Sequence, residues 1–261
     1  MSTVEKALSL LDLFAGNAPE LGLSDVARAS GFDKATTRRL LLALSNRELV
    51  EQDPATRRYR LGPGLLRLAR IREAQHPFHQ LAAPLMRALS QETGETAHLS
   101  EFKGGRLMTI HVAESMRANR VGVDVGQILP LHATASGIAF LSRTRPGMVR
   151  ACLAEKLEAR TPHTLIETAR VMELVRRAAD QGYSTNDQGY EEGVFSVGAP
   201  VLGPDGDAIG ALAVAAPVGR IDDDVVKAHG RQAIATAAAI SRRLFGMPPG
   251  QALGAGLEED A

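Results

Sequence analysis

Apolar residues at helical spacing open the chain. Val4, Leu8 and Leu11 lie three or four positions apart, and Gly16 follows as a stop signal. Residues that recur at this spacing share one face of a helix. The pattern therefore predicts a first helix from about residue 3 to residue 15.

Two further short helices follow, with Gly31 between them. We expect Ser24 to cap the helix SDVARAS and Asp33 to cap the helix KATTRRLLLALSNR, because short polar side chains satisfy the free amides of a first turn. The inward side of the second helix would carry Leu40, Leu41 and Leu44. Two short helices joined by a glycine turn are typical of a helix-turn-helix.

A hairpin and a fourth helix complete the N-terminal pattern. The alternating runs LVEQ and RRYRL flank the turn residues 53–56, with the sequence DPAT, which predicts a β-hairpin wing over residues 50–61. After the break at residues 62–64, the segment LLRLARIREAQ resumes helical spacing up to Pro77. We interpret this segment as a linker helix.

Helices and strands come in separate runs after residue 78. Helices are predicted from residue 79 to about 92, within LPLHATASGIAFLS, near 147–157 and 166–181, and from 223 to 245. Strands are predicted in TAHLSEF and RLMTIHVAE around a Lys-Gly-Gly turn, in NRVGVDV, and in GVFSVGAPVLG and AIGALAVAAPV around a Pro-Asp-Gly turn. Such an order indicates an α+β domain.

The chain has 261 residues, which exceeds one typical domain and makes two domains the first expectation. The expected parts are a winged helix-turn-helix over residues 1–62, a linker helix over 63–77 and an α+β domain over 78–245. The last stretch, residues 246–261, has the composition of a disordered tail.

Composition favours an ordinary globular protein of the cytoplasm. Hydrophobic residues make up 44% and charged residues 23% of the chain. Cys152 is the only cysteine, which excludes an internal disulfide and is most simply a small buried side chain. The N-terminus lacks the basic start and cleavage site of a signal peptide, and no apolar run is long enough to span a membrane.

Positive charge is concentrated in one region, although the net charge of the chain is zero. From Lys34 to Arg72 there are ten basic residues and three acidic ones, an excess of seven. A local positive field on an otherwise balanced protein is typical of a module that binds a polyanion.

The basic residues coincide with the parts of a winged helix-turn-helix that meet DNA. The recognition helix, residues 34–45, enters the major groove with its first turns, and the wing reaches the backbone or minor groove. Arginine can bond guanine through two donors, and threonine offers a hydroxyl and a methyl group. The predicted contacts, including the start of the preceding helix, are Ser24, Lys34, Thr36, Thr37, Arg38, Arg39, Arg57, Arg58 and Arg60. Because strand residues alternate, Arg58 and Arg60 should share a face.

Five segments resemble, in order and spacing, the IclR family of bacterial transcriptional regulators. They are VEKALSLLDLFA, LSDVARASGFDKATTRRLLLALSNRELVE, RYRLGPGLL, LPLHATASGIAFL and GYSTNDQGYEEGVFSVGAPVLGPDGDAIGALAVAAPVGRI. Together they cover the chain from about residue 3 to residue 245.

The resemblance implies a winged helix-turn-helix, a linker helix and a GAF-like effector-binding domain. It also implies a homodimer, or a dimer of dimers, that binds double-stranded operator DNA as a repressor or activator and responds to a small organic acid or catabolite. By position, the effector contacts would be Ala135, Ser136, Asn186, Val194, Ser196, Ala213 and Ala215.

This chain departs from the family pattern within that predicted pocket. The family commonly has an acidic residue at the position of Asn186 and a glutamate at that of Gly189, and some members have hydroxyls at Ala213 and Ala215. Fewer hydroxyls favour a less polar ligand, or fewer hydrogen bonds to it.

Catalytic and metal-site patterns are weaker. Ser196 lies in GVFSVG, which has one residue too many to match the G-x-S-x-G elbow of a hydrolase. His76 with His79, or His111 with Glu114, would give a metal only two ligands. His132, before a helix, could bind an anionic ligand or support its loop. We therefore expect no catalytic residue, metal or cofactor.

Two hypotheses remain open at this point. In the first, the chain is a transcription factor whose linker helix transmits effector binding to the DNA-binding part. In the second, an enzyme or ligand-binding domain does the main work and the N-terminal part serves only as a scaffold. The surplus arginines favour the first hypothesis, because phosphate contacts need positive charge and a scaffold does not.

Overall fold

A computed structural model describes residues 1–15, 20–75, 78–154 and 156–246. The chain divides into two compact units, Met1–Pro77 and Phe78–Ala261. Apart from Gly246, the predicted tail lies outside the described residues. Among the helices described, none is both long and apolar enough to cross a membrane.

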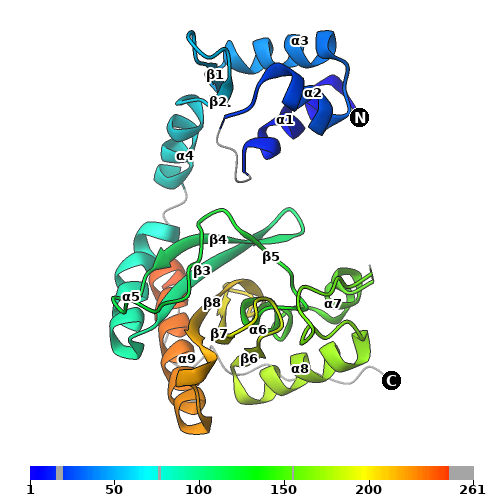
Figure 1. Ribbon diagram of the computed structural model, residues 1–261. Helices are drawn as coiled ribbons and strands as arrows, with labels where there is room; N and C mark the ends of the chain where they lie inside the picture. Colours follow the sequence, from blue (N-terminus) through cyan, green and yellow to red (C-terminus); the bar gives the residue numbers. More distant parts are fainter. Residues whose placement is uncertain (16–19, 76–77, 155, 247–261) are drawn as a thin grey trace. The chain divides into compact units, whose positions relative to one another are not determined.

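In its described residues, the N-terminal unit has four α-helices and a two-stranded hairpin (Figure 1). Its elements are α1 (Thr3–Asp12), a 3-10 turn (Leu13–Ala15), α2 (Leu23–Ser30), α3 (Lys34–Ser45), β1 (Val50–Gln52), β2 (Tyr59–Leu61) and α4 (Gly64–Gln75). The strands β1 and β2 are antiparallel. The helix-turn-helix and the hairpin that the sequence predicts are both present, and the predicted linker segment forms a helix.

Helix caps fix the geometry of this unit. Gly31 ends α2 with φ at 73°, and the Asp33 side chain accepts a hydrogen bond from the Thr36 amide at the start of α3. The prediction that Ser24 caps α2 is wrong, because the helix begins one residue earlier and its N-cap is Gly22. Asp25 closes this end by accepting from the Gly22 amide.

The C-terminal unit is built on a six-stranded sheet in the order β5-β4-β3-β8-β7-β6, with every described pairing antiparallel. The strands are β3 (Thr96–Lys103), β4 (Arg106–Ala113), β5 (Ile128–Leu129), β6 (Ser184–Asp187), β7 (Val194–Leu202) and β8 (Ala208–Pro217). The helices are α5 (Phe78–Thr93), α6 (Ala135–Leu141), α7 (Pro146–Cys152), α8 (Thr168–Gln181) and α9 (Asp223–Phe245).

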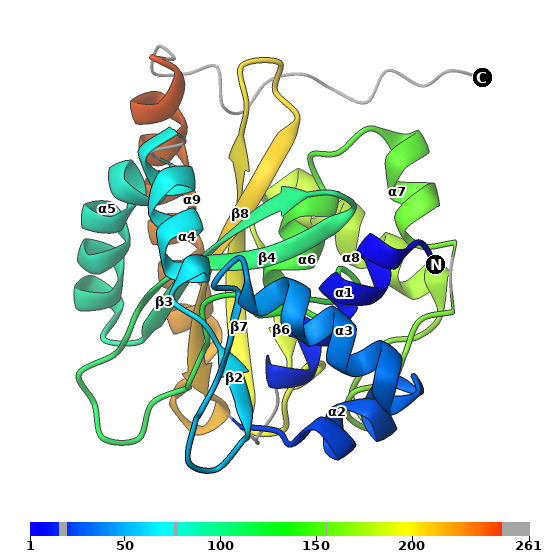
Figure 2. The same ribbon diagram turned by 90° about the horizontal axis from the view of Figure 1, so that it is seen from above.

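Two apolar clusters cover the two faces of the sheet. Helices α5 and α9 lie side by side over one face and pack on Leu99, Val201 and Leu212. Helices α6 and α8 lie on the other side and pack with Leu107 and Ala211 (Figures 1 and 2). The α+β architecture is as the sequence predicts.

Two local predictions are wrong, and two short strands, β5 and β6, are not predicted from the sequence. Residues 119–125 form no strand, and two of their carbonyls bond side chains instead of a neighbouring strand: Arg220 donates to Asn119 O and Thr96 Oγ1 to Val121 O. The short polar strand β6 is present although no strand was predicted there. Helix α7 ends at Cys152, about five residues early.

Candidate functional site

The first two turns of α3 carry three exposed cations. Lys34, Arg38 and Arg39 are exposed, and Thr36 is half-buried. Leu40, Leu41 and Leu44 of the same helix are buried in the core of the unit. Helix α3 is thus amphipathic, with its basic side turned to solvent.

Thr37 must be removed from the predicted DNA contacts. Its side chain is fully buried, and its hydroxyl donates to the Asp33 carbonyl at 2.8 Å. Spacing explains the error: Thr37 lies three and four residues before Leu40 and Leu41, and therefore on their face of the helix.

Two of the wing arginines bond groups within the N-terminal unit, Arg58 a backbone carbonyl and Arg60 two carboxylates. Arg58 Nη2 donates to the Glu20 carbonyl at 2.9 Å, and Arg60 Nε donates to Glu51 Oε1 at 2.6 Å. Arg60 Nη1 also reaches Glu20 Oε1 at 3.3 Å. Arg58 and Arg60 therefore both extend toward Glu20, in agreement with the prediction that they share a face. Arg57, at φ 59° in the hairpin turn, is exposed.

The second candidate site is a cavity in the C-terminal unit with a volume of about 60 Å³. All seven predicted effector contacts line it. Strand register explains why β-strand positions far apart in sequence meet here: Asn186 pairs with Ser196, and Ser196 pairs with Ala215. Ala135 and Ser136 reach the same space from the first turn of α6.

The two family departures near the cavity are physically linked. Asn186 Oδ1 accepts a hydrogen bond from the Gly189 amide at 3.0 Å. A Cβ atom at position 189 would lie only 2.7 Å from Asn186 Nδ2. Glycine at 189 thus leaves room for the asparagine side chain to close the turn.

Sequence reasoning missed several lining residues, and His98 is the most informative of them. His98 is buried on β3, its Nε2 lies 3.2 Å from Ser136 Oγ, and burial lowers its pKa from 6.5 to about 4. A neutral histidine thus lines the cavity at pH 7. His98 pairs with Ala213 across the sheet, so the register of the predicted strands could have identified it.

The other missed residues come from loops. Gln127 Nε2 donates to Tyr190 Oη at 2.7 Å, joining two loops at the cavity. The remaining additions are Val121, Gly122, Val123, Leu129, Thr134 and Glu191. Among the described residues no lysine or arginine lines the cavity.

Comparison with known proteins bears on both sites. The family model for the C-terminal domain of bacterial transcriptional regulator IclR matches residues 74–242, and the IclR helix-turn-helix model matches residues 3–54. The chain belongs to the IclR family. It is 30% identical to HTH-type transcriptional regulator XynR of Escherichia coli strain K12 over 245 residues, which cover 94% of this chain and 97% of XynR.

Solved structures agree with this membership of the IclR family. An IclR transcriptional regulator from Silicibacter sp. TM1040 has a TM-score of 0.83 and 39% identity, covering 95% of this chain and 98% of that one. An IclR homologue from Microbacterium hydrocarbonoxydans, solved as a complex with 4-hydroxybenzoate, has a TM-score of 0.80 and 22% identity, covering 93% and 99%.

This IclR-family protein is therefore a transcriptional regulator with a helix-turn-helix DNA-binding domain and an effector-binding domain. Its curated relatives are regulators and not enzymes. The second hypothesis, in which an enzyme or ligand-binding domain does the main work and the N-terminal part is only a scaffold, is wrong, because the N-terminal part is a DNA-binding domain.

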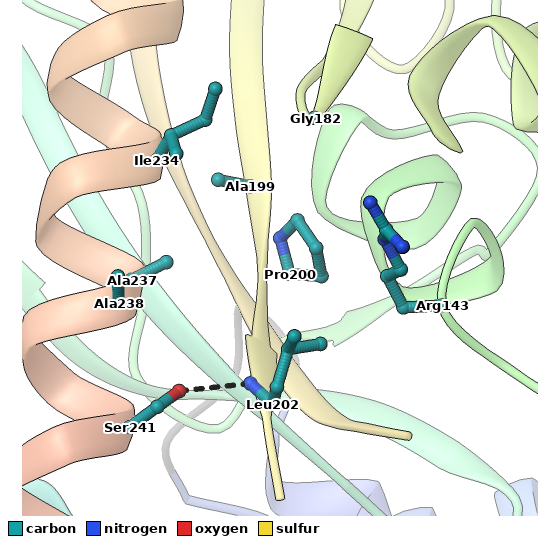
Figure 3. A pocket seen from close by; sticks show the side chains of 9 residues that line it. All are labelled: Arg143, Gly182, Ala199, Pro200, Leu202, Ile234, Ala237, Ala238 and Ser241. Carbon is teal, nitrogen blue, oxygen red and sulfur yellow. Dashed lines mark hydrogen bonds between the residues drawn. The ribbon is translucent and has the colours of Figure 1, made fainter. Parts of the chain in front are cut away.

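Another cavity of this IclR-family regulator has fewer polar side chains in its lining, namely Arg143 and Ser241. It has a volume of about 50 Å³ and lies between α9 and β7 (Figure 3). Its walls are mainly apolar, from Ile234, Ala237 and Pro200. The Ser241 hydroxyl already accepts the Leu202 amide at 3.0 Å, so this polar atom is engaged within the protein.

The histidine and cysteine candidates fit structural roles. His79 Nε2 lies 2.9 Å from His111 Nδ1, and His132 Nε2 lies 3.0 Å from the Glu158 carbonyl. Within the described part of the chain, no three potential ligands gather into a metal site, and His76 lies outside it. Burial raises the pKa of the Cys152 thiol, which makes it a weak nucleophile.

Proposed function

We propose that this regulator reads operator DNA with α3 and the β1–β2 wing, and that a small molecule in the β6–β7–β8 cavity changes its DNA affinity. The observation that carries the DNA contact is the exposure of Lys34, Arg38 and Arg39 on one helix whose opposite face is buried. Guanidinium groups so placed can bond guanine edges through two donors.

The flanking elements support a backbone contact. Ser24 is exposed in the first turn of α2, where a phosphate would meet free amides and a hydroxyl. Arg57, Arg58 and Arg60 are exposed on the wing. We propose that these residues fix the position of the protein on the duplex, while α3 reads the sequence.

We propose a small organic acid or related catabolite as the effector. The amides of Ala135 and Ser136 have no partner within α6, because they lie in its first turn, and could donate to a carboxylate. Ser196 offers a hydroxyl nearby. The structural relative solved with 4-hydroxybenzoate makes that acid a reasonable first compound to test.

We also propose a homodimer, assembling further into a dimer of dimers, that works in the cytoplasm. Exposed apolar side chains support self-association, since they would be covered by a partner. In the N-terminal unit they include Val4, Leu8, Leu66, Leu68 and Ile71. In this proposal α4 is the linker that carries the effector response to the DNA-binding part.

A gel shift on the upstream region of the gene tests the DNA contacts. We expect Arg38→Ala and Arg39→Ala each to weaken specific binding by about 1–3 kcal/mol. Arg170→Ala, an exposed arginine on α8, is the matched control and should bind as the wild type does. Equal affinity of all four proteins would remove α3 from the readout.

A further inference from the structure

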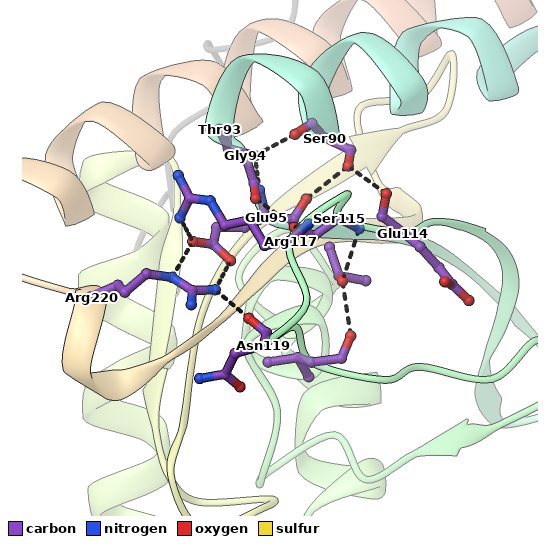
Figure 4. Close-up of polar contacts among 11 residues, drawn as sticks. Ser90, Thr93, Gly94, Glu95, Glu114, Ser115, Arg117, Asn119 and Arg220 are labelled. Carbon is purple, nitrogen blue, oxygen red and sulfur yellow. Dashed lines mark hydrogen bonds and ion pairs between the residues drawn. The ribbon is translucent and has the colours of Figure 1, made fainter.

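A buried carboxylate lies at the turn between α5 and β3. The Glu95 side chain is 3% exposed. Arg220 bonds both carboxylate oxygens: its Nε lies 2.8 Å from Oε1 and its Nη2 lies 2.6 Å from Oε2. Arg117 Nη1 donates to Oε1 at 2.6 Å (Figure 4). Burying a carboxylate is costly unless its oxygens are paired, and both oxygens of Glu95 are.

The three side chains come from three separate parts of the unit. Glu95 follows α5, and Arg220 lies in the short 3-10 turn between β8 and α9. Arg117 belongs to the segment 114–123, which follows β4. Arg220 Nη2 also donates to the Asn119 carbonyl at 3.0 Å. Arg220 thus holds this segment directly as well as through Glu95.

Neighbouring hydrogen bonds fasten the same segment along its length. Ser115 Oγ donates to the Gly94 carbonyl at 2.6 Å, and Thr96 Oγ1 donates to the Val121 carbonyl at 2.8 Å. Residues 121–123 then line the effector cavity. The cluster and the cavity are therefore joined by a few residues of one chain segment, whose backbone carbonyls are held at both Asn119 and Val121.

We propose that Glu95, Arg117 and Arg220 are positioning residues for the effector cavity: they hold segment 114–123 in place as one of its walls. The role of this wall in effector binding rests on the proposed function, whereas the anchoring of the segment does not. The two arginines differ in geometry. Arg220 needs a planar fork to bond both carboxylate oxygens, while Arg117 uses one nitrogen.

Three arginine-to-lysine variants of the full chain test this difference by hydrogen exchange. A lysine at 220 cannot form the two-point contact. Arg220→Lys should therefore speed exchange of the Ser115 and Arg117 amides, which donate to Thr96 Oγ1 and Ser115 Oγ, by about tenfold or more. Arg117→Lys should exchange close to the wild-type rate, because one ammonium can replace one contact. Arg145→Lys is the matched control, since Arg145 bonds Asp207 on the surface at 2.7 Å.

Two further measurements separate local release of the segment from other effects. Amides of β7 and β8 should keep their wild-type rates in all variants, which separates local release of the segment from general destabilisation. Equal exchange of segment 114–123 in Arg220→Lys and the wild type, or equal acceleration in Arg220→Lys and Arg117→Lys, would overturn the proposal. A gel shift with the wild-type protein tests the proposed function separately. Failure of the wild type to bind operator DNA would contradict the proposed function and would leave the exchange result for segment 114–123 unaffected.

Discussion

His98 illustrates how one buried residue shapes the chemistry of the cavity proposed to bind the effector. It lies on the sheet face that also carries Ala213, and its ring nitrogen Nε2 contacts Ser136 on α6. Burial keeps the ring neutral at pH 7, so the cavity gains hydrogen-bonding capacity there without gaining charge. A carboxylate effector would therefore depend on amide and hydroxyl donors rather than on an ion pair.

The lowered pKa of His98 predicts loss of stability in acid. The folded state keeps a pKa of about 4, whereas the unfolded chain binds a proton near pH 6.5. The contribution of His98 to the free energy of unfolding is thus fully present above pH 6.5 and falls as the pH drops toward 4. At pH 5 the loss is roughly 2 kcal/mol. Urea unfolding at pH 7 and pH 5 measures this loss.

The matched variants are His98→Gln, which cannot titrate and can still reach Ser136, and His163→Gln at an exposed position. His98→Gln should lose less free energy of unfolding between pH 7 and pH 5 than the wild type. His163→Gln should follow the wild type. A His98→Gln curve parallel to that of the wild type would show that the burial of this ring does not control acid stability.

The wing shows that charge alone does not decide how a hairpin meets DNA. From the sequence, its arginines are predicted to contact phosphates. In the structure, Arg60 is already bonded to Glu51 and Glu20. The proposed DNA contact of Arg60 would therefore compete with these two carboxylates. Exposed ion pairs contribute little to folding, so their loss should affect DNA affinity more than stability.

Glu51→Gln should tighten binding to all DNA sequences alike. The substitution replaces one of the two carboxylates that bond Arg60, while the longer contact to Glu20 remains, and it removes a negative charge beside the proposed phosphate contact. The salt dependence should steepen by about one unit of slope, because one more cation reaches the backbone. Anisotropy titrations of a labelled duplex at several salt concentrations measure both effects, with Glu173→Gln on α8 as the control. Matching behaviour of the two variants would contradict the competition.

Helices and strands whose apolar residues recur at a regular spacing are predictable from this sequence. Segments whose conformation depends on tertiary contacts are not. Helices α3 and α9 have apolar stripes and aspartate caps, and both form as predicted. Residues 119–125 alternate like a strand, but their carbonyls bond side chains from β3 and from the turn before α9. No local pattern could reveal those partners.

The same division holds for the candidate sites. The family resemblance located seven residues that line one cavity. It did not locate Gln127 and Tyr190, because the hydrogen bond that brings their loops together joins positions 63 residues apart. Gly137 is a similar case: a Cβ there would overlap the Leu131 carbonyl oxygen, a close approach that only the folded loop creates.

At the scale of the whole molecule, each unit has a core of its own. The apolar cluster around Leu10, Val26 and Leu41 lies entirely within residues 1–77, and the two clusters on the sheet lie entirely within residues 78–246. A unit that buries its own apolar surface can fold without the other. We therefore expect the fragment 78–261 to fold alone and to keep any effector affinity that the full chain has.

Coupling between the two units then makes a prediction that only the full chain can satisfy. If an effector changes operator affinity by a given factor, operator DNA must change effector affinity by the same factor, because the two binding free energies are linked. A factor of about 5–150 is typical.

The ligand for the measurement is the first organic acid that raises the melting temperature of the protein. This acid is titrated into the full chain and into the fragment 78–261, each with and without a saturating operator duplex. The fragment should bind the acid equally well with or without DNA, while the full chain should not. Identical affinities in all four titrations would mean that the cavity binds a ligand without controlling the DNA-binding domain.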